Sequence, residues 1–228
     1  MLFTEKAARE NIRNREGKRV FYLGKGDQLT SDARDFLNRE RIEILPAHLA
    51  KPDRYRLESG GYMDEKPEHM THLQGDMLVP KTHPRIAFRG AVDSLEAELL
   101  LCQLAVPEQK TELGEMLSAV RGVIRCDVLD EPVQEEKLCG LTPKEIREQS
   151  HRPQDFYGVP HFMPDVSDGE KILRINRVRA MARRAELAAV CAFGTDREDI
   201  LRLMNRMSSM LYLLMIRLKA QTSRRGGS

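Results

Sequence analysis

The sequence is poor in aromatic residues. It contains no tryptophan, and aromatic residues make up only 5% of its 228 residues. Because β-sheet cores draw on aromatic and β-branched side chains, this scarcity argues against a core built from sheets. Eleven methionines accompany many leucines and alanines, which are strong helix formers. The composition predicts a mainly α protein, large enough for one domain or for one domain with an appendage.

A strong charge of either sign is also missing. The 37 lysines and arginines nearly balance the 35 aspartates and glutamates, which leaves a formal net charge of +2. No general attraction to polyanions follows from this balance, so we expect no nucleic-acid partner. No window of about 18 uncharged apolar residues occurs, so we expect no membrane span. The start, MLFTEKAARE, is too short and too charged for a signal peptide, which favours a cytoplasmic location.

Cysteine is scarce and scattered. The four residues are Cys102, Cys126, Cys139 and Cys191, and none forms a C-x-x-C pair or lies at a close Cys/His spacing. Structural zinc sites and redox motifs need such spacings. We therefore expect reduced cysteines in a cytosolic protein and no metal bound by them.

The first fifty residues (1–50) have the pattern of a small α/β unit. A strand is expected at 19–23 (RVFYL), then a helix within LTSDARDFLNRER capped by Thr30 or Ser31, then a strand at IEIL. The GKGD between strand and helix lacks the third glycine and the later acidic residue of a dinucleotide-binding loop, so it is interpreted as a turn. This strand–helix–strand appendage is too small for a core of its own and is expected to lean on something else. The polar stretch 51–70, with prolines and a Gly-Gly pair, is interpreted as a linker.

The remaining residues, 71–228, show the periodicity of helices. Apolar stripes predict four long helices: one from Pro84 onward, about 108–129, 171–191 and 197–220. A capping box that begins at Thr142 predicts a short helix over 143–150. The following HRPQDFYGVPHFMPDVSDG is predicted to be a loop that covers a ligand. The expected fold is mainly α: an up-down helical bundle of four to five helices with the small N-terminal strand–helix–strand appendage.

A polar stripe of Asn176, Arg179, Arg183 and Glu186 runs along one face of the 171–191 helix. It lies beside an apolar stripe formed by Ile175, Val178, Ala182, Ala185 and Ala189. Arginines next to a core-facing seam can hold an anion with two hydrogen bonds each. The alternative is a salt-bridged surface in which Arg183 pairs with Glu186, and spacing alone favours this alternative.

A second basic cluster, Lys81, Arg85 and Arg89, lies at the start of the helix that begins near Pro84. Free N–H groups and the helix dipole favour an anion there. A loosely charged helix end is the alternative. Asp93 follows Arg89 by one turn and can pair with it or with an arginine of another helix.

Three segments in order, VPKTHPRIAFRGAVDSLEAE, RVRAMARRAE and LMNRMSSMLY, carry a family likeness. They resemble the V-P-K-D-D-P-R…G-T-x-D-E-L, R-x-x-x-R-R-x-E and L-N-R-L-S-D-x-L-F segments of the trimeric ATP:cob(I)alamin adenosyltransferases. The ethanolamine-utilisation type is the most similar. It shares an LTPSAR-type N-terminal unit, a T-H-L before the first segment, the R-x-D-x-x-D-E-P at 125–132 and the H-x-x-P at 161–164.

The resemblance implies transfer of the 5′-deoxyadenosyl group of ATP to cob(I)alamin with Mg²⁺, which makes adenosylcobalamin for ethanolamine breakdown and releases triphosphate. It also implies a homotrimer with sites between subunits. Arg179, Arg183, Glu186 and Asp93 take catalytic positions, with Asp93 pairing with Arg179 across a subunit interface. The positions that it places on ATP are Thr71, His72, Lys81, Arg85, Arg179, Arg183, Arg184, Glu186, Asn205 and Arg206. The positions on cobalamin are His161 and Phe162.

The chain departs from the family pattern in four places. The phosphate loop T-G-D-x-G-T-T is missing, and Thr71-His72 and Gly75-Asp76 occupy its neighbourhood. Ser209 replaces the aspartate of the last segment. The phenylalanine that displaces the lower axial ligand is out of register, with Phe162 one residue away in the 155–165 loop. The H-x₁₁-C-C-x-x-C metal motif of some members has no cysteine here, so we expect no structural metal ion.

Two other functions stay open at this point. One is a non-catalytic helical scaffold that binds polyphosphate or nucleic acid through the same arginines, and the other is a cobalamin chaperone or sensor. Ethanolamine ammonia-lyase and microcompartment components are the protein partners that the resemblance suggests, with a location inside a bacterial microcompartment. The N-terminal appendage is expected to regulate, to dock to such partners or to stabilise the assembly.

Overall fold

The computed structural model of the chain describes residues 1–15, 17–49, 55–134 and 137–225. It divides into two compact units, Met1–Tyr55 and Arg56–Ser228. Most of the described residues are helical, which confirms the mainly α prediction, and the strands lie within the first 80 residues. None of the helices within the described ranges combines the length and the apolarity that crossing a membrane requires.

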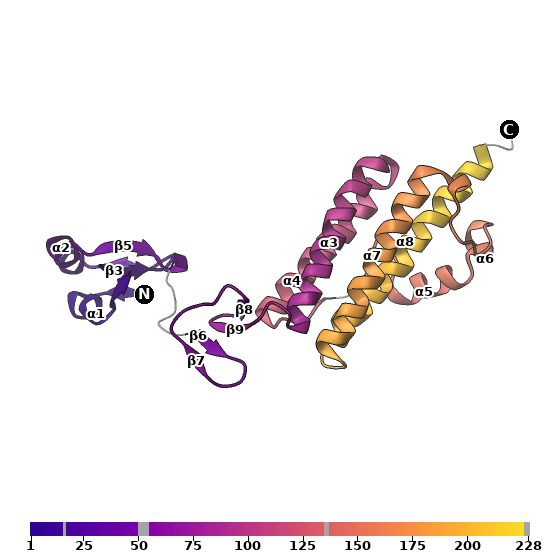
Figure 1. Cartoon of the computed structure of the whole chain (residues 1–228). Helices are drawn as coiled ribbons and strands as arrows, with labels where there is room; N and C mark the ends of the chain where they lie inside the picture. The colour runs from indigo at the N-terminus through magenta and orange to yellow at the C-terminus, as the bar shows by residue number, and fades with distance from the viewer. Residues whose placement is uncertain (16, 50–54, 135–136, 226–228) are drawn as a thin grey trace. The chain divides into compact units, whose positions relative to one another are not determined.

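The first unit contains the predicted strand–helix–strand motif (Figure 1). The strands β3 (Lys18–Leu23) and β5 (Glu43–Pro46) are parallel neighbours, joined through the helix α2 (Ser31–Arg39). Thr30 is the N-cap of α2, since its side chain accepts a hydrogen bond from the Ala33 backbone N–H at 3.3 Å. The GKGD segment after β3 is a turn, as predicted.

This unit has a core of its own, contrary to the expectation that it would lean on another part. Residues before β3 add the strand β1 (Leu2–Phe3), the helix α1 (Glu5–Glu10) and the strand β2 (Ile12–Arg15), while β4 (Gln28–Leu29) pairs with β1. A 3-10 turn, Ala47–Leu49, follows β5. The buried cluster consists of Ala8, Phe21, Ala33, Phe36, Leu37 and Ile42. The added helix supplies the cover that two strands and one helix would lack.

The second unit begins with a four-stranded sheet in the order β7-β6-β9-β8. Its strands are β6 (Tyr55–Leu57), β7 (Tyr62–Met63), β8 (Met70–Gln74) and β9 (Met77–Pro80). The stretch 51–70, interpreted as a linker, therefore carries strands, although 51–54 lie outside the described residues. The strands were missed because segments of two to five residues show almost no periodicity.

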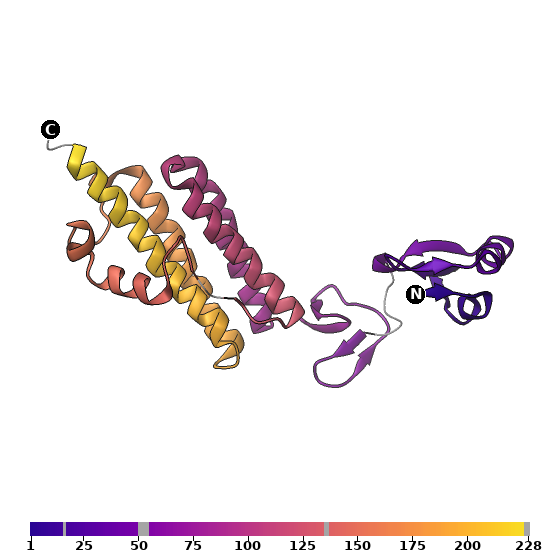
Figure 2. The same ribbon diagram turned by 180° about the vertical axis from the view of Figure 1, so that it is seen from behind.

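Six helices complete the described part of the second unit, and they are drawn in Figures 1 and 2. They are α3 (Pro84–Ala105), α4 (Lys110–Leu129), α5 (Pro143–His151), α6 (Pro153–Tyr157), α7 (Gly169–Phe193) and α8 (Glu198–Arg225), with 3-10 turns at Pro107–Gln109 and Val166–Asp168. The four long helices and the capping box at Thr142 match the prediction, whereas α6 lies in the predicted loop.

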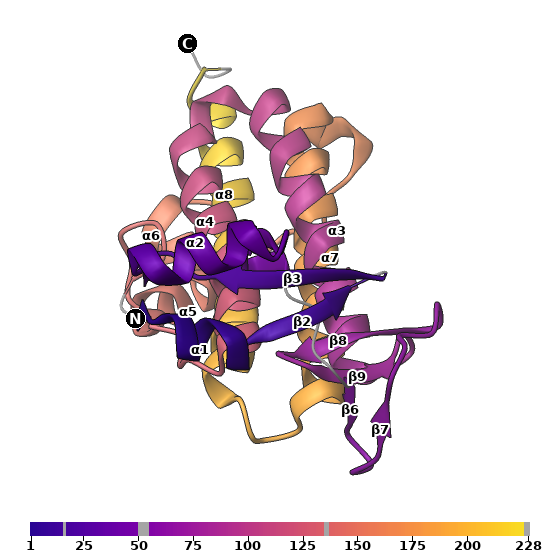
Figure 3. The ribbon, with the colours of Figure 1, turned by 90° about the vertical axis from the view of Figure 1, so that its left-hand side faces the viewer.

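The long helices bury one continuous core. Helix α7 packs against α3 on one side and α8 on the other, and α4 packs against α3 (Figure 3). Phe88, near the start of α3, packs edge-on against Phe193, the last residue of α7. Because the start of one helix lies beside the end of the other, these two helices run antiparallel. The shorter α5 and α6 lie on α8. Helix α7 is thus central, and its remaining polar face is the place to look for a site.

Candidate functional site

The apolar stripe of α7 is buried as its spacing predicts. Ile175, Val178, Ala182, Ala185 and Ala189 have at most 1% of their surface exposed. The polar stripe beside it therefore lies at the edge of the core, where the side chains are half-buried or exposed. This placement holds Arg179 and Arg183 along the groove between α7 and α8.

A cavity of about 290 Å³ lies at this groove. Its walls come from α7, α8, the end of α5 and the loop after α6. The residues that line it are Ser150, His151, His161, Arg179, Arg183, Ser208, Ser209 and Tyr212. Two of these described residues are arginines, and none is a carboxylate. The cavity therefore has two positive charges and hydroxyl groups without a negative partner of its own.

The position of Arg179 at this cavity destabilises its positive charge. The pKa of Arg179 is lowered, first because burial removes water from its guanidinium and second because Arg183 repels it. Its only hydrogen bond among those of the described residues goes from Nε to Asn176 Oδ1, at 3.0 Å. An anion placed between them would relieve both effects, since charge-assisted hydrogen bonds to arginine are strong.

The alternative prediction for the polar stripe of α7, a salt-bridged surface in which Arg183 pairs with Glu186, is wrong. Within the described residues no ion pair joins Arg183 to Glu186. Glu186 Oε1 instead accepts a hydrogen bond from Asn205 Nδ2 of α8 at 2.7 Å. Glu186 lies one turn from Arg183 on α7, so this carboxylate–amide pair flanks the cavity.

The loop that contributes His161 is held down by Tyr212 of α8. The imidazole stacks on the Tyr212 ring, with centroids 5.8 Å apart and planes 11° apart. Its Nε2 lies 3.1 Å from the His151 carbonyl oxygen and its Nδ1 lies 3.2 Å from the Tyr212 hydroxyl. Because a carbonyl only accepts, Nε2 carries the proton, and in the neutral ring Nδ1 accepts from the hydroxyl. The Phe162 backbone N–H donates to the same hydroxyl at 3.1 Å.

The neighbouring Phe162 turns away from this cavity. Its half-buried ring packs against the core and lies 6.0 Å from the Tyr212 ring, centroid to centroid. Lys219 Nζ sits over the ring, 4.1 Å from its centre. Of the two residues expected to contact cobalamin, His161 therefore lines the cavity and Phe162 anchors the loop.

The residues predicted from the last family segment do not gather at one site. Asn205 faces Glu186, but Arg206 lines a different cavity of about 500 Å³ between α4, α5 and α8. Arg184 and Asp93 are exposed, on α7 and α3. Tyr212 and Ser208 were not singled out from the sequence, although they follow Asn205 at helical spacing and could have been found that way.

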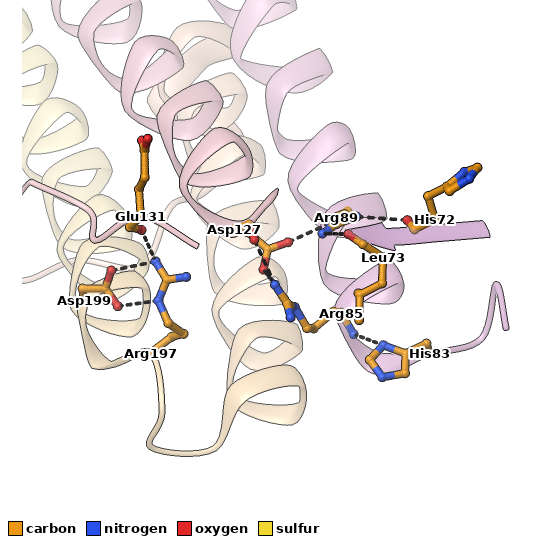
Figure 4. A network of polar contacts seen from close by, with 9 residues as sticks. All are labelled: His72, Leu73, His83, Arg85, Arg89, Asp127, Glu131, Arg197 and Asp199. Carbon is orange, nitrogen blue, oxygen red and sulfur yellow. Dashed lines mark hydrogen bonds and ion pairs between the residues drawn. The ribbon is translucent and has the colours of Figure 1, made fainter. Parts of the chain in front are cut away.

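The residues of the first segment lie elsewhere in this chain (Figure 4). Thr71 and His72 belong to β8, and Lys81 pairs with the exposed Glu68 at 3.1 Å. The guanidinium carbon of Arg85 lies 5.7 Å from the centre of the Phe193 ring at the end of α7. Phe193 is ten residues beyond Arg183, about 15 Å along a helix. Arg85 is therefore not at the α7–α8 cavity of its own chain.

The anion expected beside Arg85 and Arg89, at the start of α3, is a side chain of the protein itself. Asp127 of α4 is completely buried. Its Oδ1 accepts from Arg85 Nη2 at 2.7 Å and from Nε at 3.0 Å, and its Oδ2 accepts from Arg89 Nε at 2.7 Å. Arg85 and Arg89 therefore have a buried carboxylate partner within the chain, whereas Lys81, the third residue of the cluster, lies outside this network.

Metal ligands are not gathered anywhere in the described parts of the chain. No group of three or more histidine, cysteine, aspartate or glutamate side chains lies close enough there to hold an ion. All four cysteines are free thiols. Burial raises the pKa of Cys102 to about 11 and that of Cys139 to about 12, so these two are protonated and inert near neutral pH.

Comparison with known proteins identifies the family. The profile of the cobalamin adenosyltransferase family matches residues 61–218, more than half of the chain. The chain belongs to this family. It is 34% identical to the corrinoid adenosyltransferase EutT of Salmonella typhimurium over 158 residues, and 32% identical to the corrinoid adenosyltransferase EutT of Escherichia coli K12. Each match covers 67% of this chain and 59% of the relative, so the chain spans about three-fifths of the relatives' length.

Proposed function

We propose that the protein transfers the 5′-deoxyadenosyl group of ATP to cob(I)alamin. The observation that carries the proposal is the α7–α8 cavity, where Arg179 and Arg183 meet without a carboxylate among the lining residues. A triphosphate is the kind of ligand that two adjacent arginines without a counter-ion bind. The chain's family and the activity for which its relatives are named support the same assignment.

The protein's part in this reaction is electrostatic and geometric. The cobalt of the substrate supplies the electron pair for the new bond to C5′, and the C5′–O bond breaks as triphosphate leaves with its own pair. Charge therefore gathers on the leaving group, and Arg179 and Arg183 are positioned to stabilise it, the kind of effect worth about 10²–10³ in rate. Glu186, held by Asn205, is assigned to the ribose hydroxyls. The resemblance also assigns Arg184 and Arg206 to the nucleotide, although Arg206 lines the separate cavity between α4, α5 and α8.

A second copy of the chain is part of the proposal. One cavity of about 290 Å³ is smaller than a drug-sized binding site, and ATP with a corrinoid needs more wall than that. Thr71, His72, Lys81 and Asp93 are not among the residues that line this cavity. Exposed apolar side chains on α3 and α7 favour assembly: Leu100, Leu101, Leu104, Leu187 and Val190. A homotrimer with sites between subunits accounts for these features.

The loop held by Tyr212 is assigned to the corrinoid. His161 forms the wall that the corrin would face, and Phe162 fixes the loop on α8. A loop anchored in this way can exclude water from the cavity, which strengthens the electrostatic contacts within it. Mg²⁺ is proposed to arrive with the triphosphate, because phosphate oxygens with few protein ligands suit this ion. The product is proposed to serve ethanolamine breakdown, with the enzyme in the cytoplasm or a microcompartment.

The deciding experiment follows the visible spectrum of cob(II)alamin with a chemical reductant and ATP. Appearance of the photolabile adenosylcobalamin spectrum and of triphosphate supports the proposal. Repeating the reaction with a chelator, then with Mg²⁺ restored, tests the metal. Binding of both ligands without a new cobalt–carbon bond would instead indicate a chaperone. Steeply salt-dependent polyphosphate or nucleic-acid binding without chemistry would indicate a scaffold.

A further inference from the structure

Asp127 is the centre of a charged network inside the helical unit (Figure 4). Its side chain has no exposed surface, yet it contacts two arginines through both of its oxygens. Arg85 binds it from the first turn of α3, and the same Arg85 Nη2 also donates to the Asp127 backbone carbonyl at 2.9 Å. A buried carboxylate with this many donors fixes the start of α3 against the end of α4.

Arg89 extends this network to the sheet. Its Nε is held by Asp127 Oδ2 at 2.7 Å, while its Nη2 donates to the Leu73 carbonyl at 2.8 Å and its Nη1 to the His72 carbonyl at 3.4 Å. These carbonyls belong to β8, next to the bulge between His72 and Gln74. One guanidinium on α3 thus connects a buried carboxylate on α4 to the backbone of β8.

We infer that Asp127 is a positioning residue for the nucleotide: through Arg89 it sets the place of strand β8 and of Thr71 and His72 on it. The inference rests on the proposed function together with the sequence resemblance, which places Thr71 and His72 on ATP. It also reassigns Arg85, which the sequence resemblance put on ATP, to the structural network. Since a bulged strand has lost part of its ladder, its local path depends more on such side-chain contacts.

The test uses Asp127→Asn and Arg89→Lys in the full-length protein. Asparagine keeps the shape of Asp127 but removes its charge and one acceptor. Lysine keeps the charge of Arg89 but cannot bind the carboxylate and two carbonyls at once. Each variant is expected to raise KM for ATP by about tenfold or more, because an error of about 1 Å at a reacting group costs up to about 100-fold. KM for cobalamin is expected to stay within about twofold.

Asp199→Asn is the matched control. Asp199 is also an arginine-bound carboxylate in this region, but it binds Arg197 and the Val133 backbone N–H, with no contact to β8 (Figure 4). It is expected to leave KM for ATP unchanged. A rise in KM for ATP that is equal in Asp199→Asn would show that the effect is general loosening of the fold and would overturn the inference.

Amide hydrogen exchange over 70–74 gives a readout that does not depend on activity. Asp127→Asn and Arg89→Lys are expected to speed exchange in this strand by about tenfold or more relative to the control, because its restraint is gone. Unchanged exchange and unchanged KM for ATP would reject the positioning role. If wild type has no transferase activity, the proposed function fails, and exchange in β8 still decides whether Asp127 holds this strand.

Discussion

Two pairs of arginines in this chain differ in one respect that decides their roles. Arg85 and Arg89 share the buried carboxylate of Asp127, whereas Arg179 and Arg183 share a cavity lined by hydroxyl and imidazole groups. The first pair has its anion built in, so it holds the fold. The second pair lacks one among its lining residues, so it is suited to a ligand. An arginine cluster is thus informative about binding only when its counter-ion is known.

Stability measurements on two variants test this difference most directly: one removes the carboxylate that Arg85 and Arg89 share, and the other removes an arginine of the second pair. Asp127→Ala leaves two arginines without their buried partner, and we expect the free energy of unfolding to fall by about 3–5 kcal/mol. Arg179→Ala removes a charge that repels Arg183, so its loss is expected to stay within about 1 kcal/mol, set by packing of the stem. Urea denaturation checks both. Equal losses would mean that Arg179 has a structural partner after all.

Activity is expected to depend strongly on the Arg179–Arg183 pair, whose loss changes stability little. Arg183→Ala is expected to lower kcat/KM by about 10²–10³, because a positioned donor to the leaving group is lost. The matched control is Arg174→Ala on the same helix, where an exposed arginine pairs with Glu170 one turn away. That variant should keep wild-type rates in the spectral assay. An active Arg183→Ala enzyme would remove this residue from the mechanism.

Inorganic tripolyphosphate tests whether the second pair is an anion site. At about 100 times its Kd a ligand adds about 2.7 kcal/mol to stability, so a clear rise in Tm is expected for wild type. The Arg179→Ala/Arg183→Ala double variant should lose this rise, and added NaCl should weaken it, since the site is partly open to solvent. A rise that persists in the double variant would place the anion elsewhere.

The smallest expected effect is a change in the pH dependence of stability, and it concerns the ion pair between Arg197 and Asp199. The hydrogen bonds from Arg197 hold the pKa of Asp199 at about 2, below the ordinary value of 3.8 for an aspartate. Its contribution to stability is therefore full above about pH 4 and is lost as the pH falls toward 2. Asp199→Asn should flatten the dependence of unfolding free energy on pH in that window. An unchanged slope would mean that other carboxylates dominate acid unfolding.

Much of the helical part could be predicted because its signals are local. The stripes of α3, α4, α7 and α8 repeat over many turns, and Thr142 marks the start of α5 with its own capping box. Short strands carry no such repeat, so β6 to β9 were taken for linker and loop. Helix α6 was missed for the same reason, since it is only five residues long.

The site was predictable in part. The spacing of Arg179 and Arg183 put them on one face with Glu186, because that relation depends on one helix. Which of the arginines already had a partner depends on contacts between helices far apart in the chain. The R-x-D-x-x-D-E-P pattern at 125–132, which contains Asp127, was visible in the sequence. The contact of Asp127 with Arg85, 42 residues earlier, was not. Tyr212 was missed because its role depends on a loop that sequence periodicity does not describe.

The contact between His161 and Tyr212 also limits the coordination chemistry of the loop. In the neutral ring one nitrogen is used as a donor to the His151 carbonyl and the other as an acceptor from the tyrosine hydroxyl. The protonated nitrogen has no lone pair to offer a metal, and the lone pair of the other nitrogen is occupied by the hydroxyl. As long as these two hydrogen bonds persist, neither nitrogen of this histidine can coordinate a metal ion. Under the proposed function, His161 would therefore shape the cavity wall without joining the coordination sphere of the cobalt.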